Sequence, residues 1–203
     1  MFTLDWSFLS KKVVGNQTYL GWLMTAWETT LTISLFAFII AFAFGFLMGV
    51  FRTTQNKYLV LIGNIWTEIF RNIPVLVQVF LWYFVMPKLF PIFSKLPSFA
   101  LAVIALGLFT SSRISEQVRA GIQSIPTDQR YASLALGLTT YQSYRYVLLP
   151  VAFRLVLPPL TSEAMNIIKN SSVAFAIGVA EHTMFAIQSQ EETSRGIEIY
   201  LVV

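Results

Sequence analysis

The chain has 203 residues, of which 56% are hydrophobic and only 12% are charged, and its mean hydropathy is +0.65. This composition leaves too little polar surface to cover a water-soluble globule, so we expect most of the chain to lie in lipid. The absence of cysteine and the single histidine, His182, exclude disulfides, thiol catalysis and a metal site built from several thiolates or imidazoles. The net charge of +4 fits loops anchored at a membrane surface better than a nucleic-acid-binding surface.

The first apolar segment is uncharged from residue 29 to residue 51, between Glu28 and Arg52. A helix of this length crosses the roughly 30 Å of hydrocarbon in a bilayer, and we predict a span over residues 22–51. Gly45 and Gly49 lie four residues apart in this segment, which is the spacing that allows another helix to approach closely.

The second segment, residues 58–87, is apolar but is interrupted by charges and by a proline. Because Pro74 breaks a helical hydrogen-bond ladder, we predict an amphipathic or partly embedded helix before it and a deeper spanning piece after it. Glu68 and Arg71 lie three residues apart and can pair on a helix, which lowers the cost of each charge in lipid. The alternative is that both side chains line a substrate pathway.

A third span is predicted over residues 96–113, and the region that follows it is polar and basic. Its charged residues are Arg113, Glu116, Arg119, Asp128, Arg130, Arg145 and Arg154. An excess of arginine marks a cytoplasmic loop. Three crossings before a cytoplasmic loop place the N-terminus outside the cell.

The fourth segment, with a span predicted over residues 154–181, contains side chains that are expensive in lipid: Glu163, Asn166, Lys169, Asn170, Ser171 and Ser172. Glu163, Asn166 and Asn170 share one helix face, and Lys169 lies close beside that face. We interpret this face as part of a transport pathway, and a hydrogen-bonded seam between helices is the alternative. The adjacent prolines Pro158 and Pro159 predict a kink or a break near the start of the helix.

Residues 181–196 are polar, and the last apolar stretch, residues 197–203, is far shorter than the ~20 residues that a span needs. We expect either a piece of a longer protein whose fifth span is incomplete here, or an interfacial tail. The first of these is the favoured expectation.

The cytoplasmic loop carries a recognisable pattern, made of Tyr131, Ala132, Ser133, Gly137, Val147, Leu148, Leu149 and Pro150. This pattern resembles the signature loop of ABC importer permeases, which opens with Glu-Ala-Ala in that family, so Tyr131 and Ser133 depart from it. Residues 70–78 and 149–172 are similar to the polar amino acid permeases of the histidine/glutamine/glutamate family, and most closely to its glutamate/aspartate members.

The resemblance implies an all-α, polytopic transmembrane helical bundle with about five spans, in the bacterial cytoplasmic (inner) membrane. It implies a subunit that imports a polar amino acid, with glutamate or aspartate favoured, beside a second permease chain and an extracytoplasmic solute-binding protein. The loop over residues 120–150 would then be a coupling helix held in a cleft of an ATPase dimer. Its candidate residues are Tyr131, Ala132, Ser133, Leu134, Gly137, Leu138, Leu149 and Pro150.

The residues of this loop also suit such a role on physical grounds. Residues 131–136 favour a short helix, and Gly137 can adopt the left-handed conformation that ends one. An apolar face is predicted for Tyr131, Leu134, Ala135 and Leu138, and such a face fits a groove on a partner. The alternative is a helical hairpin packed on its own protein.

The sequence contains no phosphate-binding loop of the form Gly-x-x-x-x-Gly-Lys-Ser/Thr, so we expect ATP on a partner and no cofactor in this subunit. The candidate pathway residues are Glu68, Arg71, Glu163, Asn166, Lys169, Asn170, Ser171 and Ser172. The two cations among them can offset a substrate carboxylate. A channel or secondary transporter could use the same charges but would not need the loop, whereas a structural or signalling partner could use the loop but would not need the polar stripe.

Overall fold

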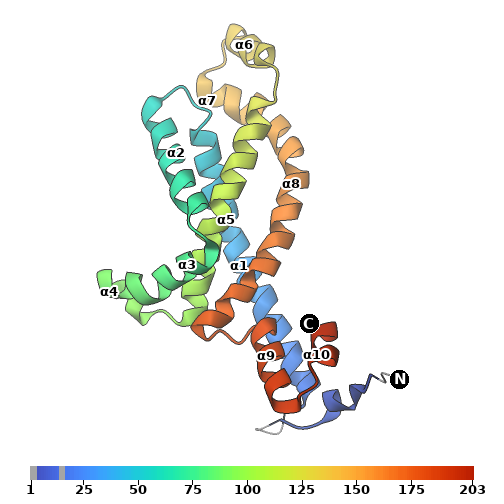
Figure 1. The fold of residues 1–203 in the computed structure, drawn as a ribbon. Helices are drawn as coiled ribbons and strands as arrows, with labels where there is room; N and C mark the ends of the chain where they lie inside the picture. Colours follow the sequence, from blue (N-terminus) through green and yellow to red (C-terminus); the bar gives the residue numbers. More distant parts are fainter. Residues whose placement is uncertain (1–3, 14–16) are drawn as a thin grey trace.

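The computed structural model describes residues 4–13 and 17–203, and over these residues the chain is helical. The predicted all-α class is confirmed, since the described part contains an isolated bridge between Lys12 and Thr18 but no strand. Within these described ranges, three helical segments are long and apolar enough to cross a membrane: Tyr19–Phe51, Ser98–Gln123 and Thr140–Ile177. A fourth candidate is a pair of helices bent at a short break, and all four lie side by side (Figure 1).

The longest helix, α1 (Tyr19–Phe51), packs along α5 (Ser98–Gln123). A Cβ atom placed on Gly45 would lie 2.6 Å from Ile114 Cβ, and one placed on Gly49 would lie 2.6 Å from Val118 Cβ. These distances leave no room for a side chain. The close contact predicted from the two glycines is therefore confirmed, and its partner is α5.

The second crossing is bent by 101° between α2 (Lys57–Asn72) and the segment that begins with α3 (Val75–Phe80). The break lies at Ile73 and Pro74, as the proline predicts. Gln78, which is buried, donates its side-chain amide to the carbonyl oxygens of Phe70, at 2.7 Å, and Ile73, at 2.9 Å. One side chain thus satisfies two acceptors at the end of α2. The chain continues through η2 (Leu81–Val85), α4 (Met86–Leu89) and η3 (Pro91–Lys95).

Two helices run further than their charges and prolines suggest. α5 does not end near Arg113 but continues to Gln123, because its polar residues find partners on neighbouring helices. α8 (Leu149–Asn170) begins before Arg154 and runs through Pro158 and Pro159 without a break. The break that the proline pair could have caused is therefore absent. A short segment, η5 (Ser171–Ile177), follows α8.

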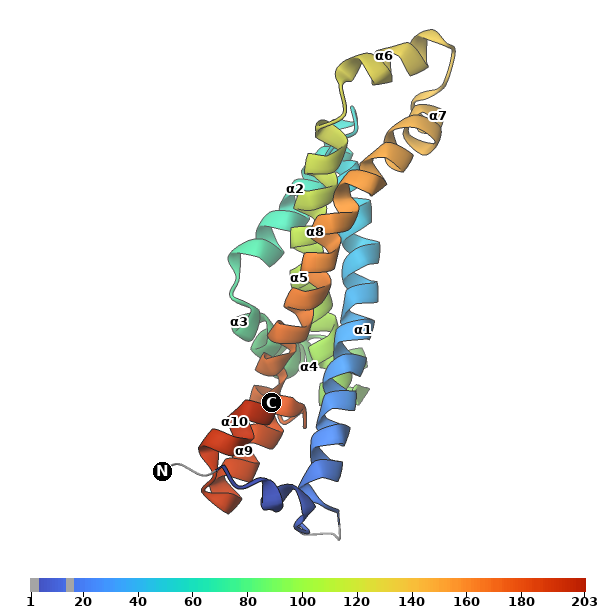
Figure 2. The same cartoon turned by 90° about the vertical axis from the view of Figure 1, so that its right-hand side faces the viewer.

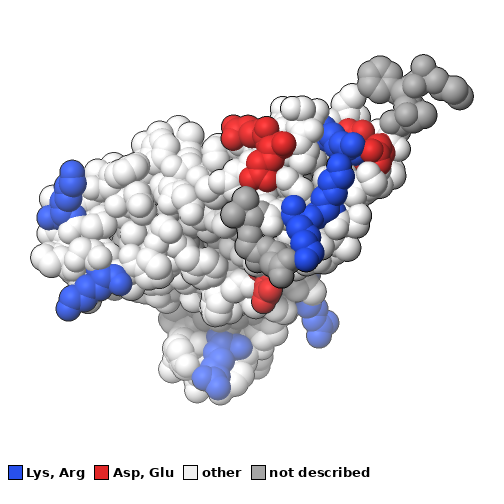
Figure 3. Space-filling view, turned by 90° about the horizontal axis from the view of Figure 1, so that it is seen from below, with Lys and Arg blue, Asp and Glu red and all other residues white. Residues whose placement is uncertain are grey.

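At one end of the molecule, η1 (Trp6–Ser10) and α9 (His182–Thr193) pack against the first turns of α1, and α10 (Gly196–Val202) packs against α9 (Figure 2). Their shared core contains Phe8, Tyr19, Leu23, Ala26, Phe185, Ala186 and Ile199. The polar residues 181–196 are thus mostly helical, and the final apolar stretch packs as a short helix. Viewed from this end, the surface carries both acidic and basic side chains (Figure 3).

An ion pair ties the N-terminal segment to this end: Arg195 Nη1 lies 2.6 Å from Asp5 Oδ2. Hydrogen bonding from Ser7 and the charge of Arg195 hold the pKa of Asp5 well below its usual range. η1, which follows Asp5, is therefore held beside the chain's last helices.

The opposite end is formed by α6 (Thr127–Ala135), α7 (Thr140–Ser143) and η4 (Tyr144–Leu148), which lead from α5 into α8. α6 projects beyond the ends of the long helices (Figures 1 and 2). The described N-terminal segment and α6 lie at opposite ends of the bundle, which is the arrangement expected when three crossings separate them.

Candidate functional site

The projecting loop contains the predicted helix and its predicted glycine stop. Gly137 has φ of 83°, in the left-handed region that glycine adopts without a steric cost. Its N–H donates to Leu134 O at 3.0 Å, and the N–H of Leu138 donates to Ser133 O at 3.2 Å. This pair of hydrogen bonds is the Schellman arrangement that ends a helix. The prediction for Gly137 is confirmed.

The exposed apolar tip of α6 differs in part from the predicted face. Tyr131 is 67% exposed and Ala135 is exposed, as expected, but Leu134 and Leu138 are half-buried. Leu136 is 83% exposed and was missing from the predicted face. The helix ends one residue before Leu136, so helical spacing no longer governs the direction of its side chain.

The remaining candidate residues of the predicted coupling loop lie, for the most part, closer to the body of the protein. Ala132 is exposed, whereas Ser133 is buried between α6 and α7. Leu149 is half-buried and Pro150 is exposed, and both lie in the first turn of α8. The structure therefore separates an exposed tip on α6 from a base at the start of α8.

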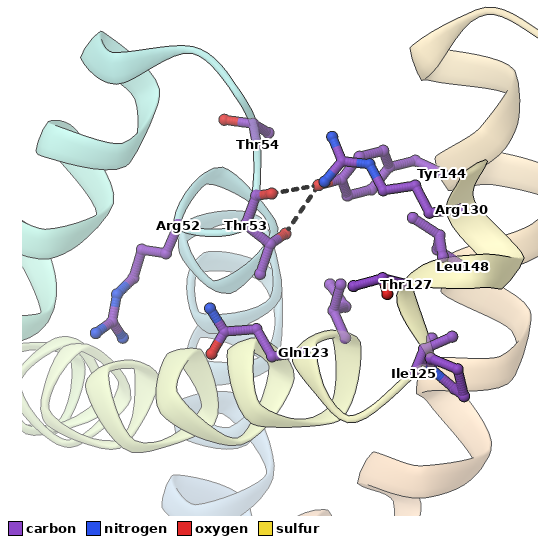
Figure 4. A pocket seen from close by; sticks show the side chains of 11 residues that line it. Arg52, Thr53, Thr54, Gln123, Ile125, Thr127, Arg130, Tyr144 and Leu148 are labelled. Carbon is purple, nitrogen blue, oxygen red and sulfur yellow. Dashed lines mark hydrogen bonds between the residues drawn. The ribbon is translucent and has the colours of Figure 1, made fainter. Parts of the chain in front are cut away.

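Short polar contacts hold the loop together and against α1. Ser133 Oγ lies 2.6 Å from Ser143 Oγ, which joins α6 to α7. The Tyr144 hydroxyl donates to Thr53 O at 2.5 Å, and the Arg130 guanidinium lies over the Tyr144 ring, 6.0 Å from its centroid (Figure 4). Thr53, Arg130 and Tyr144 line a polar cavity of about 330 Å³ beside the ends of α1 and α5. A displacement of α6 would therefore reach the end of α1 through direct contacts.

A second group of charged and polar residues lies on α5 and on the two helices beside it. We call this group the polar face, and it consists of Glu68, Arg71, Arg113, Glu116, Gln117 and Glu163. On α5, Arg113, Glu116 and Gln117 lie at helical spacing. α2 and α8 both pack against α5 (Figure 1), and the partners of these three residues lie on those two helices.

On the α2 side, Arg71 joins two carboxylates. Its Nη2 lies 2.8 Å from Glu68 Oε1, and its Nη1 lies 3.0 Å from Glu116 Oε1. The predicted pairing of Glu68 with Arg71 is confirmed. The same Glu116 oxygen also lies 2.9 Å from Nη2 of Arg52, whose buried side chain donates through Nε to Asn64. Ion pairs thus connect α1, α2 and α5.

On the α8 side, the buried carboxylate of Glu163 receives two partners from α5. Arg113 Nε lies 3.0 Å from Glu163 Oε2, and Gln117 Nε2 donates to Glu163 Oε1 at 3.1 Å. A buried carboxylate is stable only when it is paired and hydrogen-bonded in this way. Arg113 itself is 44% exposed, so one side of the pair remains open.

The other predicted pathway residues divide into two groups. Asn166 and Asn170 are half-buried and Lys169 is exposed, and none of the three forms a side-chain hydrogen bond or ion pair within residues 4–13 and 17–203. Ser171 is buried and donates to Ile168 O at 2.7 Å, while Ser172 is half-buried. The structure therefore places Asn166, Lys169 and Asn170 as available polar groups, while the hydroxyl of Ser171 is used by the last turn of α8.

Four members of these networks were not identified from the sequence: Arg52, Arg113, Glu116 and Gln117. The sequence alone places Arg52 and Arg113 at the charged ends of predicted spans. The spacing of Arg113, Glu116 and Gln117 was a usable signal, because it continues the helical period of the preceding apolar segment. Their partners, however, lie far away in the sequence.

Comparison with known proteins gives consistent results. Residues 41–201 match the family described as "Binding-protein-dependent transport system inner membrane component". The chain is 44% identical over 192 residues to the glutamate/aspartate import permease protein GltJ of Escherichia coli K12, which covers 88% of this chain and 78% of GltJ. It is 35% identical to the probable amino-acid permease protein YxeN of Bacillus subtilis, over 92% of this chain and 79% of YxeN.

Solved structures agree with these relatives. A chain from the crystal structure of an amino acid ABC transporter with histidines has a TM-score of 0.82 and 29% identity, and the match covers 99% of this chain and 89% of that chain. A chain of the MetNI methionine ABC transporter in an inward-facing conformation has a TM-score of 0.75 at 22% identity, over 89% of this chain and 88% of that chain, which shows a shared fold.

Proposed function

Because the chain belongs to the family of binding-protein-dependent transport system inner membrane components, we propose that it forms half of the membrane pathway through which glutamate or aspartate is imported. It is a transmembrane permease of the amino-acid ABC importer type. The choice of cargo is supported by the similarity to GltJ and by the cations described above.

The observation that carries the proposal is the exposure of the polar face on three candidate membrane spans, which are two long helical segments and the bent pair that begins with α2. Side chains of Glu68, Arg71 and Arg113 are about half exposed, at 52%, 45% and 44%. Charges at such positions are expensive in hydrocarbon and face water or protein instead. We infer that a second permease chain, identical or related, covers this face and that the two chains enclose the pathway between them.

The cations beside this pathway favour an acidic cargo. Lys169 has no ion pair within the described part of the chain, and Arg113 is balanced by one carboxylate, Glu163, while remaining partly exposed. A substrate carboxylate that leaves water is stabilised by such cations. Asn166 and Asn170 offer amide groups that can donate to the same substrate.

The energy source in this proposal is a separate ATPase dimer. The sequence has no phosphate-binding loop, and the exposed tip of α6 offers an apolar surface for a partner. By the distribution of arginines, α6 lies on the cytoplasmic side of the bacterial inner membrane and the N-terminus lies outside. An extracytoplasmic solute-binding protein would then dock at the end formed by α9 and α10, and no cofactor is bound by this subunit.

The first test is the substitution Gly137→Asp in the complex that this chain forms with the proteins encoded by neighbouring genes. A side chain at φ of 83° strains the helix stop, and a carboxylate beside the apolar tip disfavours docking. We expect the ATPase to be lost during purification and ATP-dependent uptake of glutamate and aspartate into proteoliposomes to fall at least tenfold.

A matched control is available in Gly178→Asp. Gly178 also has a left-handed φ, 79°, but it follows η5 and lies away from α6. This variant should retain the ATPase. Loss of the ATPase in both variants would indicate a general folding defect, and uptake without any ATPase would favour a channel or a secondary transporter over the proposed importer.

The role of Lys169 in the pathway can be tested separately with Lys169→Ala. Loss of one charge-assisted hydrogen bond to the cargo should raise the KM for glutamate uptake about tenfold or more, with the ATPase retained. Lys95→Ala, at an exposed lysine in η3, serves as the control and should leave the KM unchanged. Uptake by Lys169→Ala at the normal KM would remove this residue from the pathway.

A further inference from the structure

A groove of about 650 Å³ lies between the end of α1, the start of α2 and the segment formed by α7 and η4. Its apolar walls include Val50, Phe51, Leu59 and Leu149. The substrate pathway does not use this groove, because none of the residues of the polar face lines it. The groove is also distinct from the exposed tip of α6.

The position of the groove corresponds to the boundary between hydrocarbon and headgroups. Val50 and Phe51 are at the end of the first candidate span, and Leu59 lies in the first turn of α2. Two exposed tyrosines near the groove, Tyr58 and Tyr141, have 79% and 68% of their surface accessible. Tyrosine is enriched at this depth because its ring is apolar and its hydroxyl is polar.

The rim of the groove is positively charged, and the described residues supply no compensating carboxylate there. Arg145 lines the groove, donates through Nη1 to the Tyr141 hydroxyl at 3.1 Å, and forms no ion pair within the described residues. Lys57 begins α2 beside the groove residue Asn56, is exposed, and is likewise without an ion pair in that part of the chain. Among the residues that the structure describes, no aspartate or glutamate lines the groove.

We propose that this groove binds an anionic phospholipid, with an acyl chain between the walls formed by α1, α2 and α8 and the phosphate at Arg145. The apolar walls remove hydrocarbon surface from water, and the uncompensated cations attract a negative headgroup. Tyr141 is placed to donate to the same headgroup once its ring is at the interface. The lipid would connect the turn between α1 and α2 to the base of the loop that carries α6.

The proposal is tested on the complete complex, reconstituted in nanodiscs of equal parts phosphatidylglycerol and phosphatidylcholine and then delipidated with mild detergent. Native mass spectrometry counts the lipids that remain bound. The wild type should retain phosphatidylglycerol in preference to phosphatidylcholine. Arg145→Gln should reduce the retained phosphatidylglycerol about fivefold, because one basic residue near the surface is removed.

Two further variants separate the groove from general surface charge. Leu59→Trp fills the groove without changing any charge and should lower phosphatidylglycerol retention to a similar extent. Arg154→Gln removes an exposed arginine of α8 that does not line the groove, and it should leave retention unchanged. Unchanged retention in both Arg145→Gln and Leu59→Trp would overturn the proposal, and so would equal loss in Arg154→Gln or equal retention of both lipids by the wild type.

A protein occupant would give a different result. If a segment of another subunit fills the groove, Leu59→Trp should release that subunit, and the wild type should retain no phosphatidylglycerol that depends on Arg145. This outcome would also overturn the lipid proposal. None of these measurements depends on transport, so they remain informative even if the proposed cargo is wrong.

Discussion

Replacing Gly45 by leucine is expected to prevent α1 from packing on α5 and to abolish most of the folded protein. A Cβ atom at this position would already lie 2.6 Å from Ile114 Cβ and 2.7 Å from Ser111 O, so the larger side chain forces the two helices apart. Overpacking of this kind lowers the free energy of unfolding by about 3 kcal/mol, at the upper end of the usual range. The measurement is the fraction of detergent-solubilised protein that elutes as a single peak with its partner subunits.

The control for this substitution lies on the same helix. At Gly21, an added Cβ would meet Gln17 Cγ at 3.2 Å, and this atom belongs to a flexible side chain that can move away. Gly21→Ala should therefore leave the folded fraction close to that of the wild type. If Gly45→Leu folds as well as Gly21→Ala, the close approach of α1 and α5 is not required.

Replacing Arg52 by alanine is expected to destabilise the joint of α1, α2 and α5. Its side chain is only 3% exposed and contacts Glu116 at 2.9 Å and Asn64 at 2.9 Å, so its loss leaves groups without their buried partner. Removing one member of a buried pair costs about 3–5 kcal/mol, and we expect a cost of about 3 kcal/mol because Glu116 is 34% exposed and keeps Arg71 as a partner. The thermal unfolding midpoint should fall by roughly 6–12 °C.

Arg71→Ala provides the comparison, because Arg71 contacts the same Glu116 oxygen at 3.0 Å but is 45% exposed. A half-exposed ion pair contributes at most about 1 kcal/mol, so the midpoint should shift far less than in Arg52→Ala. Equal shifts in the two variants would contradict the view that burial decides the difference. The two measurements should be made in the same detergent and at the same salt concentration.

The features that the sequence predicted correctly depend on neighbouring residues. Pro74 breaks the second crossing, Gly137 ends α6, and Glu68 pairs with Arg71 three residues away. Each of these follows from backbone sterics or from the spacing within one helix. The close approach of α1 to another helix was also predictable from Gly45 and its companion, although the identity of that helix was not.

The features that the sequence did not predict depend on distant partners. Arg113 was expected near the end of a span, but Glu163, fifty residues later, neutralises it and α5 continues. Leu134 and Leu138 are half-buried where α6 packs against α7 and η4, and no local pattern encodes that packing. The three polar-face residues on α5 were therefore absent from the predicted pathway. Only the polar-face residues on α2 and α8 interrupt an otherwise apolar segment.

The amide of Gln78 has a mechanical consequence for the second crossing. This one side chain holds the carbonyl oxygens of both Phe70 and Ile73, so changing the 101° angle would leave two acceptors without a donor in a medium that contains no water. α2 and α3, on either side of Pro74, therefore move together as one rigid body with a fixed angle between them. Rotation of α2 about its axis would swing α3 sideways through an arc, which converts a small twist at one membrane surface into a larger lateral movement near the opposite one.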